Sequence, residues 1–182
     1  QTVDNVLMSE TTPLGDASVT SEIMAMQGLR NSGEVCFFGS ASGLEPGLVS
    51  VMADPVGTDC TAENGCGVYV HRGESCLNNL MQGGHYYSTV DDPWATTGYL
   101  TTDADGSSGM FFDCVSTGES DMEGHAFVVH ADNGSRVSCG LLLSEPEERS
   151  SPTAAPASSV GKLAPLASAL AMVTAAVIAV TL

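Results

Sequence analysis

The sequence has little positive charge. Its 182 residues include 5 Lys and Arg against 22 Asp and Glu, which gives a formal net charge of −17. Proteins that bind nucleic acid contact the phosphates with clustered Lys and Arg, so this composition argues against a nucleic-acid partner. It would also repel an anionic substrate, unless the few basic residues lie beside the site that receives it.

Aromatic residues and helical periodicity are also scarce. Aromatic residues make up 5% of the chain, whereas glycine occurs 20 times. Outside the C-terminal segment, the only candidate helix is a turn within Ser75–Gln82. Short alternating segments separated by turn-rich stretches predict an all-β fold, an antiparallel sandwich or Greek-key barrel. The predicted strands cover residues 6–9, 22–27, 34–40, 48–53, 67–71, 110–115 and 126–130.

The six cysteines do not form any C-x-x-C pair, and Cys60 and Cys66 are the closest two. A cytosolic zinc site therefore has little support. An even number of cysteines, combined with a tail that looks membrane-directed, suggests an oxidising compartment and a disulfide framework. Spacing alone leaves 15 connectivities open.

The C-terminal part of the chain differs in composition from the rest. Residues 145–162 are rich in Pro, Ser, Ala and Glu and predict a disordered linker after a domain over residues 1–144. Residues 163–182 are apolar and uncharged. Small residues, a polar spacer and a hydrophobic end are typical of a GPI-attachment signal, while a helical tail anchor or a plain hydrophobic terminus are the alternatives. We expect an extracellular domain held at the outer leaflet of a membrane.

The four histidines suggest a metal site. His71 and His130 end two predicted strands, and His85 lies in a Gly-Gly-His-Tyr-Tyr loop. Imidazole suits copper, and a rigid sheet can fix the geometry of its ligands. His125 has the opposite strand parity to His130, so we expect it at the surface or behind a ligand.

Several short motifs follow one another in a fixed order over about residues 20–142. They are Gly33–Leu44, Gly67-Val-Tyr-Val-His71, Cys76, Gly83-Gly-His85, Gly98-Tyr-Leu100, Asp103-Ala-Asp-Gly106, Phe127-Val-Val-His130 and Gly134–Gly140. Together they resemble the copper/zinc superoxide dismutase family. The His85-Tyr-Tyr sequence followed by Asp92-Pro-Trp94 is more similar to its extracellular copper-only branch.

The resemblance implies a function and a set of site residues. It makes His71, His85 and His130 copper ligands, and it makes Arg136 the cation that guides superoxide to the copper. His85 would also carry a proton during the conversion of superoxide to dioxygen and hydrogen peroxide. Finally, it implies a Cys76–Cys139 disulfide. Resemblance and proximity together suggest the pairs Cys60–Cys66 and Cys36–Cys114.

One ligand position departs from the family. Tyr69 stands where the family has a His two residues before His71, and residues two apart in a strand share a face. A neutral phenol with a pKa near ~10 is a poor copper ligand. Either Cu(II) recruits a phenolate, or three histidines hold Cu(I) while Tyr69 stays unbound. The alternative is a catalytically degenerate surface domain that binds copper or is purely structural.

The zinc ligands of the family are also missing. The segment from Tyr86 to Tyr99 lacks the additional ligating His and Asp, with Tyr99 at the family's aspartate position, so we expect no zinc. His85 then needs another partner to hold its ring. A carboxylate from Asp91 or Asp92 is our hypothesis, and the alternative is that these acids only cap the turn before Pro93.

Overall fold

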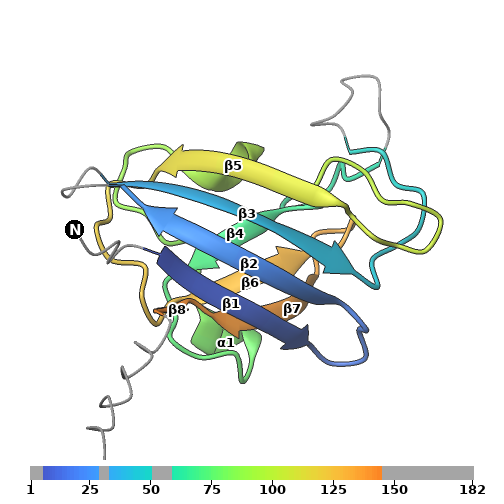
Figure 1. Ribbon diagram of the computed structural model, residues 1–182, viewed down its shortest axis with the longest axis horizontal. Coiled ribbons are helices and arrows are strands. Elements are labelled where there is room, and N and C mark those ends of the chain that lie inside the picture. Colours follow the sequence, from blue (N-terminus) through green and yellow to red (C-terminus); the bar gives the residue numbers. More distant parts are fainter. Residues whose placement is uncertain (1–5, 29–32, 51–58, 145–182) are drawn as a thin grey trace, which may run out of the picture. The chain divides into compact units, whose positions relative to one another are not determined.

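Eight β-strands and two single helical turns form the regular structure of this computed structural model, which describes residues 6–28, 33–50 and 59–144 (Figure 1). The linker and hydrophobic segment predicted over residues 145–182 lie outside the described residues. The elements are β1 Val6–Pro13, β2 Thr20–Gln27, β3 Glu34–Ser42, β4 Val68–His71, α1 Asn79–Gln82, the 3-10 turn η1 Pro93–Thr96, β5 Met110–Ser116, β6 Ala126–His130, β7 Arg136–Leu141 and β8 Leu143–Ser144.

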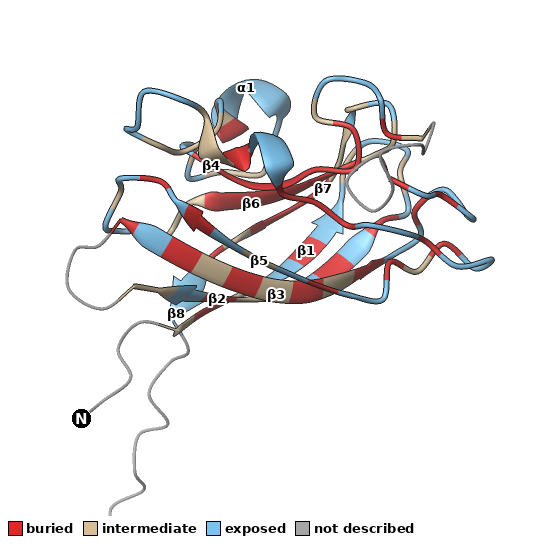
Figure 2. Ribbon diagram, turned by 90° about the horizontal axis from the view of Figure 1, so that it is seen from above, coloured by how far each residue is buried: buried red, intermediate tan, exposed pale blue. Residues whose placement is uncertain are grey.

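The strands pair in the order β4-β6-β7-β1-β2-β3-β5, with β8 on the edge of β1, and every pair is antiparallel. One layer holds β8, β1, β2, β3 and β5, and the other holds β4, β6 and β7 (Figure 2). The start of β1 pairs with β2, while Thr12 and Pro13 pair with β7, so β1 joins the two layers. The connections from β3 to β4 and from β5 to β6 cross between layers, as in a Greek key. The predicted all-β fold is confirmed.

Aromatic rings fill the space between the layers. The Phe37 ring lies 5.6 Å from Phe127, 6.0 Å from Trp94 and 6.5 Å from Phe111, measured between centroids. Trp94 is fully buried, and its indole N–H donates to the carbonyl of Tyr86 at 3.0 Å. Trp94 therefore packs η1 onto the core that supports the site.

Strands β4 and β6 are buried at every position. Their inward side chains join the main core, while Ala126 and Val128 face a second, smaller cluster with Cys76 and Cys139. Two buried faces explain why these strands show continuous hydrophobic runs instead of alternation.

Three disulfides brace the fold, and no cysteine is free. The pairs are Cys36–Cys114 between β3 and β5, Cys60–Cys66 within one loop, and Cys76–Cys139 between the segment after β4 and β7. These are the three pairs suggested by the sequence. The last one closes a separation of 63 residues and holds the segment that carries α1 against β7.

The structure differs from the predicted elements at both β7 and residues 48–53. Strand β7 was not predicted because the small residues Ser138, Cys139 and Gly140 are buried in succession, without a hydrophobic alternation. Ser138 is satisfied there by its contact with the Thr11 hydroxyl. Of the strand predicted over residues 48–53, the described part forms only isolated bridges at Val49 and Ser50. No helix among the described residues is long and apolar enough to cross a membrane.

Candidate functional site

Three of the four histidine rings come together on one face of the antiparallel β4–β6 pair. His71 ends β4, His130 ends β6, and His85 forms a bridge with His71 from the following loop. Their ring centroids are 5.1 Å apart for His71–His85, 5.5 Å for His71–His130 and 6.5 Å for His85–His130. His71 and His130 are almost fully buried, and His85 lines a surface pocket.

The Nδ1 atom of each of these rings has an oxygen partner. His71 Nδ1 lies 3.0 Å from the Gly83 carbonyl, and His130 Nδ1 lies 3.2 Å from the Gly67 carbonyl. A carbonyl oxygen only accepts hydrogen bonds, so these two Nδ1 atoms carry the proton. Each neutral ring then keeps its lone pair on Nε2, and the Nε2 of His71 is buried without a hydrogen-bond partner.

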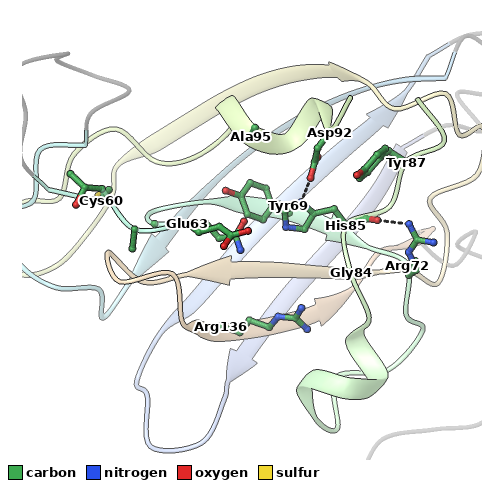
Figure 3. Close-up of a pocket in the computed structure, with 14 residues that line it drawn as sticks. Cys60, Glu63, Tyr69, Arg72, Gly84, His85, Tyr87, Asp92, Ala95 and Arg136 are labelled. Atoms are coloured by element: carbon green, nitrogen blue, oxygen red, sulfur yellow. Dashed lines mark hydrogen bonds and ion pairs between the residues drawn. The ribbon is translucent and has the colours of Figure 1, made fainter. Parts of the chain in front are cut away.

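His85 follows the same pattern with a carboxylate as its partner. Its Nδ1 lies 2.6 Å from Asp92 Oδ2 (Figure 3). The other oxygen of Asp92 accepts from the Trp94 backbone N–H at 2.9 Å and caps η1. One oxygen of Asp92 thus holds the His85 ring, and the other caps the turn at Pro93, so Asp92 performs both roles considered for these acids. Only the backbone carbonyl of Asp91 makes a contact, with Thr89.

Burial keeps the two enclosed histidines neutral. It lowers the pKa of His71 to about 4, an effect that the hydrogen bond to Gly83 partly offsets. It lowers the pKa of His130 to about 3, with a further contribution from the neighbouring His71. A neutral imidazole with a free Nε2 is the form that binds a metal ion.

Tyr69 lies beside the three rings. Its ring centroid is 4.4 Å from that of His85, 4.8 Å from that of His130 and 6.4 Å from that of His71. Its hydroxyl end lies over Gly67, where a Cβ would overlap both Oη and Cζ, so only glycine fits at that position. Burial, followed by the charge of Asp92, raises the pKa of Tyr69 to about 12, and the phenol is therefore neutral.

The three rings fit a single metal ion with limited adjustment. Three imidazoles around one ion, each with Nε2 at about 2 Å from it, have centroids roughly 5.5 Å apart. The His71–His85 and His71–His130 spacings are close to this value. The third spacing, between His85 and His130, is wider, and Tyr69 lies beside both of these rings. As placed, no three His, Cys, Asp or Glu side chains of the described residues already form a metal-binding group. To match the expected spacing, the ring centroids of His85 and His130 would have to approach by about 1 Å from 6.5 Å.

A pocket of about 790 Å³ opens beside the histidines, lined by His85, Tyr69 and Asp92 among others (Figure 3). Arg72 and Arg136 are the only Lys or Arg residues in the described part of the chain, and both line this pocket. In a chain of net charge −17, this places the Lys and Arg charge of the described residues beside the pocket that leads to His85.

Arg136 also holds the site together. Its Nη2 donates to the Gly83 carbonyl at 2.7 Å, and its Nη1 donates to the Asn79 carbonyl at 2.8 Å and to Gln82 Oε1 at 3.0 Å. Burial lowers the pKa of Arg136, but an arginine remains charged. Arg136 thus fixes the α1 segment against β7 and shares the Gly83 carbonyl with His71.

Sequence reasoning missed two supporting side chains. Arg72 donates from Nη2 to the His85 carbonyl at 3.0 Å, and its place directly after His71 was the available signal. Buried Tyr99 donates to the His130 carbonyl at 3.0 Å. His125 lies outside the group of three rings, as expected, and stacks on Tyr86 at 3.9 Å with Nδ1 on the Arg72 carbonyl.

Comparisons with known proteins gave matches among solved structures only. No protein-family model and no curated protein matched the sequence. The clock protein EA4 is 16% identical, with 78% of this chain and 96% of that chain covered and a TM-score of 0.47. A mutant of Candida albicans superoxide dismutase 5 is 18% identical, with 84% and 100% covered and a TM-score of 0.46. Its Cu(II) form is 16% identical, with 83% and 100% covered and a TM-score of 0.46. Similarities of this size do not assign a family or an activity to the chain.

Replacing Asp92 with Ala should release His85 from its single tautomer, because Asp92 Oδ2 is the acceptor for its Nδ1 proton. We expect ring ¹⁵N chemical shifts to report the Nδ1–H form in the unmodified protein and a mixture of both tautomers in Asp92→Ala. Asp91→Ala is the matched control and should leave the spectrum unchanged. Identical His85 shifts in all three proteins would contradict the role of Asp92.

Acidification should destabilise the metal-free protein. In the unfolded chain, His71 and His130 become protonated near pH ~6.5. In the folded state, burial lowers the pKa of His71 to about 4 and that of His130 to about 3. Between these limits the unfolded state binds more protons, so stability falls as the pH drops below the unfolded value. The two rings contribute a slope of up to about 2.7 kcal/mol per pH unit.

The check is the free energy of urea unfolding between neutral and mildly acidic pH, measured with a metal chelator present. His130→Gln should remove up to half of the histidine contribution to the slope. Equal slopes in the two proteins would show that His130 is not buried in its neutral form.

Proposed function

We propose that the chain binds one copper ion through His71, His85 and His130 and converts superoxide to dioxygen and hydrogen peroxide. The observation that carries the proposal is the hydrogen-bonding pattern that the three neighbouring rings share. Each Nδ1 has an oxygen partner, so each Nε2 keeps a lone pair that can bind a metal ion. Two of the three ring spacings are close to those expected around one ion. The resemblance of the ordered motifs to copper-containing superoxide dismutases supports the choice of reaction.

The available donors restrict the choice of metal. All six cysteines are in disulfides, and Asp92 already binds His85 Nδ1 and the Trp94 N–H. The three histidine rings provide three neutral nitrogens, a set that suits copper or zinc. The motif resemblance favours copper, with no zinc, and the experiment below compares the two metals directly.

A bound copper ion supplies one-electron chemistry, by which one superoxide is oxidised to dioxygen and a second is reduced, with two protons, to hydrogen peroxide. The chain itself provides the approach and a proton. Arg136 and Arg72 attract the anion into the pocket and offset the acidic surface. Asp92 orients the His85 ring, whose Nε2 can carry one proton only while it is not bonded to the metal, and solvent in the pocket provides the other.

A second candidate function is copper binding without turnover. Tyr69 favours it, because a buried neutral phenol occupies the position where the family has a fourth imidazole. Such a domain would keep the histidine ligands and lose the reaction at a single position.

The proposal includes a cellular setting. Three disulfides fit an oxidising compartment. We place the domain outside the cell, with residues 145–162 as a linker. Residues 163–182 would serve either as the signal for a GPI anchor or as a tail helix, and either would hold the domain at the outer leaflet.

The test uses the full chain in detergent, loaded separately with copper and with zinc, with metal content and the decay of superoxide both measured. We expect one copper per chain and rapid decay with copper only. His130→Gln should lose both copper and activity. Unchanged copper content in His130→Gln would overturn the site. One bound copper without activity, restored by Tyr69→His, would overturn turnover and establish the second candidate.

Arg136 variants in the same assay separate charge from architecture. Arg136→Glu should slow the reaction and weaken its dependence on ionic strength, because an attractive charge becomes repulsive. Arg136→Lys keeps the charge but loses part of the hydrogen bonds that the guanidinium makes, so it should retain more of the rate than Arg136→Glu. Equal losses in both variants would show that the hydrogen bonds of the guanidinium matter and that its charge does not.

A further inference from the structure

We infer that this site holds Cu(I) in strong preference to Cu(II), with Tyr69 as the residue that determines the preference. The inference rests on the proposed copper site of His71, His85 and His130 and adds the oxidation state in which that site retains the metal. It is carried by the direction of the Tyr69 side chain, the three neutral imidazole donors, and the position of Arg136.

The Tyr69 hydroxyl is directed away from His71. Gly67, just before β4, and His71, at its end, lie two residues on either side of Tyr69, and the phenol leans over Gly67. The Tyr69 ring is accordingly farther from His71, at 6.4 Å, than from His85 or His130. Its carbon ring therefore flanks the gap between His85 and His130, and its oxygen lies at the far end.

With the carbon ring of Tyr69 in this position, the protein provides three ligands to the metal. Cu(II) favours a tetragonal set of nitrogen or oxygen donors and so needs a fourth in-plane ligand. A closed-shell d¹⁰ ion such as Cu(I) has no geometric preference from its d-electrons, as is known for zinc. Three imidazoles therefore satisfy Cu(I), whereas Cu(II) has to take its fourth in-plane ligand from solvent.

Charge acts in the same direction. All three nitrogen donors are neutral, two of their rings are almost fully buried, and the nearby carboxylate of Asp92 is bonded to His85 and Trp94. The Arg136 guanidinium shares the Gly83 carbonyl with His71 and adds positive charge close by. Because the cost of burying an ion rises steeply with its charge, a dication is penalised here more than a monocation.

Competition titrations on the full chain test the inference without an activity assay. Cu(I) affinity is measured under anaerobic reducing conditions against a chromophoric Cu(I) chelator, and Cu(II) affinity is measured against a Cu(II) chelator. Tyr69→Phe is the matched control, because it removes only the hydroxyl. We expect it to keep the ratio of Cu(I) to Cu(II) affinity. Tyr69→His should lower that ratio at least tenfold, mainly through tighter Cu(II), which corresponds to about 59 mV in reduction potential.

Two results would overturn the inference while leaving the copper site intact. One is a visible phenolate-to-Cu(II) absorption band in the unmodified protein that disappears in Tyr69→Phe together with Cu(II) affinity, because Tyr69 would then be a ligand. The other is an unchanged ratio in Tyr69→His. Failure of the proposed function looks different: neither ion binds, or His130→Gln leaves both affinities unchanged.

Discussion

The carbonyl oxygen of Gly83 is the acceptor on which the site depends. It receives hydrogen bonds from His71 Nδ1 at 3.0 Å and from Arg136 Nη2 at 2.7 Å, so one peptide group links β4, the α1 segment and β7. Gly83 has a φ of 71°, a conformation that favours glycine, and a Cβ here would lie 2.9 Å from Arg72 Cγ. The Cys76–Cys139 disulfide holds the same segment to the same strand. Without this junction, the loop would not fix the tautomer of His71 or the position of the neighbouring His85.

The two layers of strands exclude water from part of the site. Strands β4 and β6 are covered on both faces, so the imidazoles at their ends are enclosed and remain neutral. His85 is different because it comes from a loop and faces the pocket, with Asp92 behind it. The arrangement therefore combines two buried donors with one donor that solvent and a small anion can reach. Arg72 and Arg136 place the positive charge of the described residues at that same opening.

Much of the fold could be predicted, because its strands carry their own signals. Alternation marked β3, continuous apolar residues marked β6, and both were found. Strand β7 has neither signal, since its buried centre is made of Ser138, Cys139 and Gly140. The site shows the same division. The strand ends and the glycine-rich loop marked the three histidines, but backbone acceptors such as Gly67 and Gly83 carry no signal in side-chain chemistry. The choice between Asp91 and Asp92 likewise depended on the path of the loop, which adjacent identical residues do not reveal.

In the proposed site, the Nε2 atoms of three histidines share one copper ion. Anomalous diffraction at the copper edge, from crystals of the copper-loaded chain, tests it most directly. We expect one strong peak bonded to the Nε2 atoms of His71, His85 and His130, with the Nδ1 atoms still on Gly83, Asp92 and Gly67. A peak on the acidic surface away from these rings, or a copper ion bound through Nδ1, would contradict it.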